Sequence, residues 1–330
     1  MTRLLVTLLT VVLFAGAARA ADITPAIVFD MGGKFDKSFN ESVHEGAEAF
    51  TKATGIVVRE FETQNAAQRE QSLRNFARRG QNPIIAVGFA QATAVKAVAA
   101  EFPALRFVII DSVVEAPNVQ SILFREEQGS YLAGMLAALR SGTGKVGFIG
   151  GMDVPLIRKF ACGYVQGARA ANPRIEVLQN MTGSTPAAWA DPVRGAELAR
   201  SQIERGADVV FHAAGATGVG VLQAAADAGK FGIGVDSNQN RLHPGRVLTS
   251  MVKQLDVATR ATLEAARTDT WKPGTTVLGL AEDGVGLAFD NDNAPAVTAE
   301  MRGRVDAARA EIIAGRTTVH DYMSNNACPN

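Results

Sequence analysis

Cysteine is scarce in this chain of 330 residues, which contains only Cys162 and Cys328. Two cysteines so far apart exclude a disulfide framework and a zinc knuckle, because both need several cysteines at close spacing. A single bridge that pins the C-terminal tail stays an alternative to two free thiols, since pairing requires Cα atoms within about 7 Å.

A charge excess is also absent. The 33 basic and 33 acidic residues cancel, which gives no support to a nucleic-acid partner or an anionic membrane surface.

Long hydrophobic runs are missing as well. The apolar stretch 4–14 follows Arg3 and precedes the small residues of 18–20. A membrane-spanning helix needs about 20 apolar residues, so this pattern predicts a cleaved signal peptide over residues 1–20. No cysteine stands at the predicted cleavage point to carry a lipid anchor. We therefore expect an exported, periplasmic protein whose mature part is slightly acidic.

Motifs of common enzyme and cofactor sites do not occur. Segment 142–145 lacks the rest of a phosphate-binding P-loop, no turn reads G-x-G-x-x-G, and there is no G-x-S-x-G nucleophile elbow. The four histidines have no metal-ligand spacing. Pro295 replaces the glycine that a calcium loop beginning at Asp290 requires. The sequence thus predicts no catalytic residue, no metal site and no cofactor.

Short β-branched apolar runs alternate with amphipathic segments along the chain. We predict strands at 26–29, 56–58, 84–87, 107–110, 119–123, 146–149, 175–178, 209–211, 233–235, 247–251 and 277–280. Helical spacing lies at 38–51, 66–79, 90–100, 155–171 and 191–205. This alternation predicts an α/β fold with parallel sheets built from right-handed βαβ units. The length indicates two domains, and we place the break at 141–144.

Helix boundaries carry their own signals. Ser38 and Glu41 have the spacing of a capping box, in which each side chain bonds a backbone N–H at the helix start. Pro155 stands where a first helical turn tolerates a missing N–H. Glycines 80, 206 and 229 each follow a predicted helix, as C-terminal caps do.

The residues that end the strands indicate a ligand site, because ligands of open parallel sheets lie outside the carboxyl ends of the strands. Asp30, Asp111 and Asp236 each follow a predicted strand directly, and 213–218 is a glycine-rich turn. The segment GGKFDKSFN at 32–40 adds aromatic, carboxylate and carboxamide groups after the first strand. A nucleobase needs this mixture, a ring to stack on and acceptors for its N–H groups. The alternative is a capped turn with Phe39 in the core.

The same segment resembles the signature of the basic membrane protein family, the purine-nucleoside-receptor-like substrate-binding proteins of ABC importers. Further resemblance follows in order along the chain. The matching segments are YLAG at 131–134, VGFIGGMDVP at 146–155, Phe160, GYVQG at 163–167, WADP at 189–192, AAGATG at 213–218, GVDS at 234–237, LTSMVK at 248–253 and IIAGR at 312–316. The resemblance therefore covers nearly the whole mature chain.

The family resemblance implies a type I periplasmic-binding-protein fold, with two Rossmann-like lobes joined by a three-stranded hinge. We expect the N-terminal lobe at 21–141 plus about 247–275, and the C-terminal lobe at 142–246 plus about 276–330. The ligand would lie in the cleft between the lobes, with Gly215 in its glycine-rich turn. Phe39 and Phe211 would sandwich a base, with His212 as a neighbouring alternative.

Polar roles also follow from the resemblance. Asp36 and Asn40 would meet the base, while Asp111, Asp236 and Lys253 would hold the ribose hydroxyls. The chain departs from the family at 237–240, which reads SNQN where the family more often has a second acid. Trp189 is a second departure, expected to reach the cleft and narrow it.

The resemblance implies a monomeric receptor that binds a purine nucleoside or a related small solute by hinge closure and delivers it to an ABC permease in the inner membrane. The alternative is a sensory receptor lobe that signals through a membrane partner. A secreted nucleoside-processing enzyme is disfavoured, because no nucleophile, metal cluster or positioned base emerges.

Overall fold

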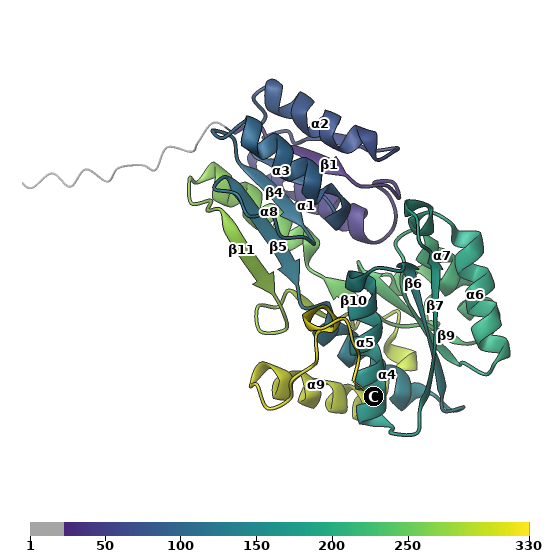
Figure 1. Ribbon diagram of the computed structural model, residues 1–330. Coiled ribbons are helices and arrows are strands. Elements are labelled where there is room, and N and C mark those ends of the chain that lie inside the picture. Colours follow the sequence, from purple (N-terminus) through teal and green to yellow (C-terminus); the bar gives the residue numbers. More distant parts are fainter. Residues whose placement is uncertain (1–22, 330) are drawn as a thin grey trace, which may run out of the picture.

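The computed structural model describes residues 23–329, and the predicted signal peptide lies outside them. Within these residues the chain forms two six-stranded sheets (Figure 1). The first sheet has the spatial order β11 (Gly274–Leu278), β5 (Val119–Phe124), β4 (Phe107–Ile110), β3 (Ile84–Ala86), β1 (Ala26–Phe29) and β2 (Arg59–Glu62). The second has the order β12 (Val285–Leu287), β10 (Val247–Lys253), β9 (Phe231–Asp236), β8 (Val209–Ala213), β6 (Lys145–Met152) and β7 (Glu176–Gly183).

All neighbouring strands run parallel except β12, which is antiparallel to β10. The α-helices that pack on the sheets are α1 (Phe39–Thr54), α2 (Ala67–Arg78), α3 (Ala92–Glu101), α4 (Glu126–Arg140), α5 (Pro155–Ala171), α6 (Pro192–Glu204), α7 (Thr217–Asp227), α8 (Leu255–Arg267) and α9 (Ala299–Ile313). The predicted α/β fold with parallel sheets is confirmed. None of the helices between residues 23 and 329 has both the length and the apolar sequence needed to cross a bilayer.

Two lobes follow from this arrangement. The first lobe is the first sheet with α1, α2, α3 and α8, and the second lobe is the second sheet with α4 to α7 and α9. The chain crosses between them three times, at Arg125, at Gln254 and over 279–284. The crossings are hydrogen-bonded to one another: Arg125 N donates to Leu278 O and Gln254 N to Gly284 O, each at 2.9 Å. We call these three segments the hinge.

The expected lobe boundaries need two changes. The first crossing precedes α4 instead of following it at 141–144, because α4 packs on α5 and not on the first sheet. Glycines make this contact close: a Cβ atom at Gly167 of α5 would lie 1.8 Å from the carbonyl oxygen of Tyr131 in α4. The second change concerns β10, which lies in the second sheet, so the chain returns to the first lobe after Lys253 and not near 247.

Edge strands account for the other differences. The predicted strand 56–58 is wrong, since β2 begins at Arg59 and its side chains are mostly exposed at the sheet edge. Ile56 and Val58 instead pack on the core as a loop. Strand β11 begins earlier than predicted and is also exposed, and β12 was not predicted. The exposed edge strands β2 and β11 carry polar residues and β12 has only three residues, so a search for apolar runs misses these strands or misplaces their ends.

Helix punctuation follows the sequence more closely. Helix α5 begins at Pro155 as predicted. Glycines 80, 206 and 229 follow α2, α6 and α7 with positive φ angles of 70°, 103° and 68°, the left-handed conformation expected of a C-terminal cap.

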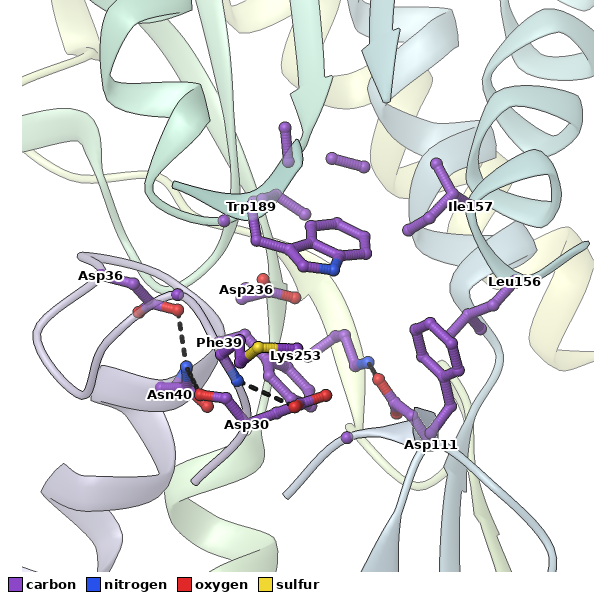
Figure 2. A pocket seen from close by; sticks show the side chains of 18 of the residues that line it. Asp30, Asp36, Phe39, Asn40, Asp111, Leu156, Ile157, Trp189, Asp236 and Lys253 are labelled. Atoms are coloured by element: carbon purple, nitrogen blue, oxygen red, sulfur yellow. Dashed lines mark hydrogen bonds and ion pairs between the residues drawn. The ribbon is translucent and has the colours of Figure 1, made fainter. Parts of the chain in front are cut away.

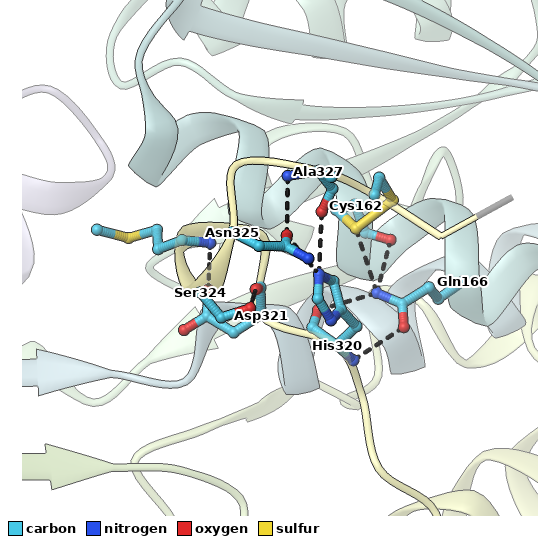
Figure 3. The surroundings of a disulfide bond; sticks show 9 residues. Cys162, Gln166, His320, Asp321, Ser324, Asn325 and Ala327 are labelled. Carbon is cyan, nitrogen blue, oxygen red and sulfur yellow. Dashed lines mark hydrogen bonds between the residues drawn. A yellow bond between two sulfur atoms is a disulfide. The ribbon is translucent and has the colours of Figure 1, made fainter.

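The two cysteines form a disulfide bond that holds the C-terminal tail on α5, with a Cα–Cα distance of 5.5 Å (Figure 3). Gln166, one helical turn after Cys162, bonds the tail as well. Its Nε2 donates to His320 O at 3.0 Å, and its Oε1 accepts from His320 N at 2.9 Å. The alternative that the sequence left open is therefore decided in favour of the single bridge.

The close approach of α4 and α5 yields a stability prediction. We expect Gly167→Ala to lower the free energy of unfolding by about 1–3 kcal/mol, because the new methyl group overlaps the backbone of Tyr131. The matched control is Gly303→Ala in α9, where a Cβ atom meets nothing within 4 Å, so the substitution should stabilise by about 0.5–1 kcal/mol. Urea unfolding monitored by circular dichroism measures both. Equal effects at the two positions would contradict the packing described.

Candidate functional site

A cavity lies between the lobes, at the carboxyl ends of the central strands (Figure 2). The first lobe contributes Asp30, Met31, Gly32, Asp36, Phe39, Asn40, Gly88, Phe89 and Asp111. The second contributes Leu156, Ile157, Phe160, Trp189, Ala213, Ala214, Gly215, Val235, Asp236 and Lys253. All predicted site residues except Phe211 are among them, and their contact with a ligand stays a prediction.

Asp36 organises the loop between β1 and α1. Its Oδ1 accepts from the backbone N–H of Ser38 at 2.8 Å and of Glu41 at 3.1 Å, and its Oδ2 accepts from Asn40 N at 3.0 Å. Burial raises the pKa of Asp36 to about 7, although these three bonds oppose the shift. The predicted capping box is wrong: Ser38 makes no capping bond, and Asp36 satisfies the N–H groups at the helix start instead.

Asn40 presents an acceptor at the cavity wall. Its Nδ2 donates to the carbonyl oxygens of Gly33 at 3.1 Å and Asp30 at 3.4 Å. Carbonyl oxygens only accept, so this pair fixes which way the amide faces. The other atom, Oδ1, is buried and accepts no hydrogen bond from the part of the chain that the structure describes. A buried acceptor without a donor is costly, so Oδ1 suits a ligand that carries an N–H or O–H group.

Asp111 and Asp236 occupy equivalent places at the ends of β4 and β9. Both have positive φ angles, 66° and 63°, a conformation that non-glycine residues rarely adopt and that recurs at functional sites. Asp236 Oδ2 accepts from Ser38 Oγ at 2.6 Å. Burial raises the pKa of Asp236. The third strand-end aspartate, Asp30, pairs with Arg69 at 2.9 Å.

Lys253 is the lysine of the cavity wall, and its ammonium group is fully engaged. Nζ lies 2.8 and 2.7 Å from the two oxygens of Asp111 and 3.1 Å from Glu126 Oε1. The contacts with Asp111 are hydrogen bonds, and the contact with Glu126 is an ion pair. Burial alone would lower the pKa of Lys253, but the carboxylates of Asp111 and Glu126 outweigh it and raise the pKa. Lys253 therefore holds Asp111 in place, a role that the sequence did not suggest.

Aromatic faces come from both lobes. Phe39 is the first residue of α1, and Trp189 ends the 3-10 helix Pro186–Trp189. Figure 2 shows the Trp189 indole approaching from the second lobe and Phe39 from the first. Gly151 makes room for the indole, because a Cβ atom there would lie 2.1 Å from the ring. Phe160 and Phe89 also line the cavity. Phe160 lay within the family-like segments, whereas Phe89 follows the strand-end glycine Gly88 and lies in none of those segments.

Phe211 does not line the cavity, contrary to its predicted role as an aromatic face for the ligand. Its side chain is fully buried inside the second lobe, with ring centroids 5.5 Å from Phe148 and 5.3 Å from Tyr164. The predicted strand 209–211 ended too early: β8 runs on to Ala213, so Ala213 and not Phe211 reaches the edge of the sheet. His212 is fully buried too and bonds Gln239 at 2.9 Å. Burial lowers the pKa of His212 to about 4.

The arrangement suits binding. Among residues 23–329 no group of three or more His, Cys, Asp or Glu side chains is placed to hold a metal ion. The cavity combines flat aromatic faces with acceptors, Asn40 Oδ1 and the oxygens of Asp36 and Asp236. A planar ligand with several N–H or O–H groups matches this combination.

Known proteins resemble the chain along most of its length. The model of the Bmp family, described as ABC transporter substrate-binding protein PnrA-like, matches residues 23–321. A CD4+ T-cell-stimulating antigen of Listeria monocytogenes is 32% identical, with 89% of this chain and 87% of that protein covered. The ABC transporter nucleoside-binding protein BmpA of Lactococcus lactis is 32% identical over 90% and 89%. An uncharacterized lipoprotein of Pyrococcus horikoshii is 32% identical over 80% and 68%.

A solved structure gives the same picture of the fold. The crystal structure of an ABC transporter solute-binding protein from Aeropyrum pernix superimposes with a TM-score of 0.84 at 26% sequence identity. The alignment covers 92% of this chain and 95% of the other.

The burial of Asp36 predicts a dependence of stability on pH. A raised pKa means that the folded chain holds the proton more tightly than the unfolded chain, whose carboxyl has its ordinary value of 3.8. The resulting stabilisation is complete below pH 3.8 and is lost as the pH rises through about 7. Relative to Asp36→Asn, the free energy of unfolding should fall by roughly 1 kcal/mol per pH unit in this window.

Urea unfolding at a series of pH values measures the difference. The control is Asp191→Asn, which alters an exposed aspartate that caps α6 by accepting from Arg194 N. A pH profile that Asp36→Asn leaves unchanged would argue against a raised pKa at this carboxyl.

Proposed function

The chain belongs to the Bmp family of PnrA-like ABC transporter substrate-binding proteins, and from this premise we propose that it captures a purine nucleoside or a related purine in the cavity between its lobes. Proteins of this class bind small-molecule ligands and interact with membrane permeases. The observation that carries the proposal is the pairing of aromatic faces from opposite lobes with buried acceptors beside them. The Lactococcus lactis relative, named a nucleoside-binding protein, supports the same ligand class.

The aromatic side chains of the cavity bind the base of the nucleoside by stacking. A purine ring between Phe39 and Trp189 contacts both lobes at once, and Phe160 offers a further apolar edge. Asp36 and Asn40 lie beside Phe39, so the N–H groups of a base meet the carboxylate and Asn40 Oδ1. Each stacked base adds about 1–3 kcal/mol to binding in other proteins.

The charged groups of the cavity favour a nucleoside over a nucleotide. Four aspartates line it, Asp30, Asp36, Asp111 and Asp236, against one lysine. That lysine is engaged by Asp111 and Glu126. A phosphate group would meet the carboxylates of Asp36 and Asp236, which have no ion-pair partner among residues 23–329, and no further cation lines the cavity there; this is unfavourable in a buried site. Ribose hydroxyls, in contrast, donate well to Asp236 Oδ1 and to the remaining lone pairs of the Asp111 oxygens.

Transport follows from closure of the lobes. A ligand that touches both lobes binds the closed state more tightly than the open one, and so shifts the population toward closure. We propose that the closed, loaded protein is a monomer that docks on an ABC permease of the inner membrane. We further propose export to the periplasm through residues 1–20. The lipoprotein relative differs here, because this sequence has no cysteine at the predicted cleavage point.

The ligand can be identified directly. The chain purified from its native host should carry a purine compound that mass spectrometry detects, and guanosine or adenosine should raise its melting temperature. Guanosine monophosphate should raise it much less, because of the carboxylates in the cavity. Binding of a solute without a flat ring, together with no response to nucleosides, would refute the nucleoside proposal.

Phe39 provides a test of the stacking geometry. Phe39→Ala should weaken nucleoside binding by about 1–3 kcal/mol, since one face of the base is lost. Phe35→Ala is the matched control, because Phe35 lies in the same loop but is 63% exposed and does not line the cavity. Titration calorimetry measures both variants. An unchanged affinity in Phe39→Ala would remove this ring from the site.

A further inference from the structure

Hydrogen bonds join the lobes directly beside the cavity. They connect the first-lobe loop that contains Lys37 and Ser38 with the second-lobe segment 235–239. Ser38 Oγ donates to Asp236 Oδ2 at 2.6 Å, Ser237 Oγ donates to Ser38 O at 2.9 Å, and Gln239 Nε2 donates to Lys37 O at 2.9 Å. We call these three bonds the interlobe latch.

Gln239 is held in the orientation that the latch needs. Its Oε1 accepts from Val235 N at 3.0 Å and faces Nε2 of His212 at 2.9 Å. A backbone N–H only donates, so Oε1 is the atom on that side and Nε2 must face Lys37 O. Gln239 is 1% exposed and His212 is fully buried. The second lobe therefore presents this donor in place before the lobes meet.

Neither Ser237 nor Gln239 lines the cavity. Their partners do lie next to it: Ser237 bonds Ser38, which precedes Phe39, and Gln239 bonds Lys37, which follows Asp36. Both residues belong to segment 237–240, where the sequence departs from the family pattern. The contacts they make are thus separate from ligand recognition but act on the same loop.

We propose that Ser237 and Gln239 are positioning residues that raise ligand affinity by holding the lobes together around the cavity. Their bonds to Ser38 and Lys37 span the two lobes, so they stabilise the closed state over the open one. The apparent dissociation constant is the intrinsic constant divided by the closed fraction, so any stabilisation of the closed state strengthens binding. The inference about affinity rests on the proposed nucleoside function, whereas the inference about closure does not.

The test measures shape and affinity separately. Small-angle X-ray scattering of the free protein gives its radius of gyration, and calorimetry with guanosine gives affinity. Ser237→Ala removes one latch bond, while Gln239→Leu removes another together with two bonds inside the second lobe. Gln202→Leu is the matched control, because Gln202 is equally buried but bonds Phe148 and Asn180 within its own lobe.

We expect Ser237→Ala to bind guanosine roughly three- to tenfold more weakly and Gln239→Leu to bind at least as weakly. The radius of gyration of the free variants should rise. Gln202→Leu should change neither quantity. The proposal is overturned if both latch variants keep the wild-type radius and affinity, or if Gln202→Leu shows the same losses. If guanosine does not bind the wild type, the nucleoside proposal fails, and the radius of the free protein alone then decides for or against the latch.

Discussion

The ammonium group of Lys253 is where the two lobes, the hinge and the cavity meet. Lys253 is the last residue of β10 in the second lobe. Its ammonium group pairs with Asp111 at the end of β4 in the first lobe and with Glu126, which lies just after the first crossing. The rings of Phe124, Phe39 and Phe160 surround it at 4.8–5.9 Å. Removing one partner of such a buried pair costs about 3–5 kcal/mol. The ion pair between Lys253 and Asp111 therefore both fixes part of the cavity wall and joins the two lobes.

A second buried ammonium extends this cluster toward the C-terminus. Lys159 of α5 donates to Phe124 O at 2.8 Å and pairs with Glu126 at 2.9 Å and Glu127 at 3.2 Å. Asp321 of the tail lies 3.6 Å from the same nitrogen. The residues that flank the crossing at Arg125 are thus contacted by two buried lysines of the second lobe, Lys159 and Lys253. The tail that the disulfide fastens to α5 therefore contributes the carboxylate of Asp321 to this cluster.

Secondary-structure elements that follow a repeating pattern could be predicted from the sequence, whereas features that depend on tertiary packing could not. Buried strands and helices followed from apolar runs, and the eight predicted site residues that line the cavity followed from strand ends and family-like motifs. The choice between Phe211 and Trp189 as the second aromatic face did not, because it depends on where β8 ends and on the space left by Gly151. The boundary before α4 was missed for a similar reason. An apolar helix shows that it is buried, but not against which sheet.

Hydrogen bonds that cross between lobes were outside the reach of sequence patterns altogether. Ser38 carries the signature of a capping residue, yet its hydroxyl bonds Asp236, which is 198 residues away in the chain. Asp36 takes over the cap because its carboxylate can accept several N–H groups at once. Local spacing identifies the residues of such a loop, and only the tertiary structure assigns their partners.

Because the chain crosses between the lobes three times, the first lobe becomes complete only late in the synthesis of the chain. The first lobe begins with β1 but lacks α8, which packs on α1, and its edge strand β11 until the chain has been made as far as Leu278. A chain that emerges from its N-terminus therefore stays without a complete first lobe during most of its synthesis.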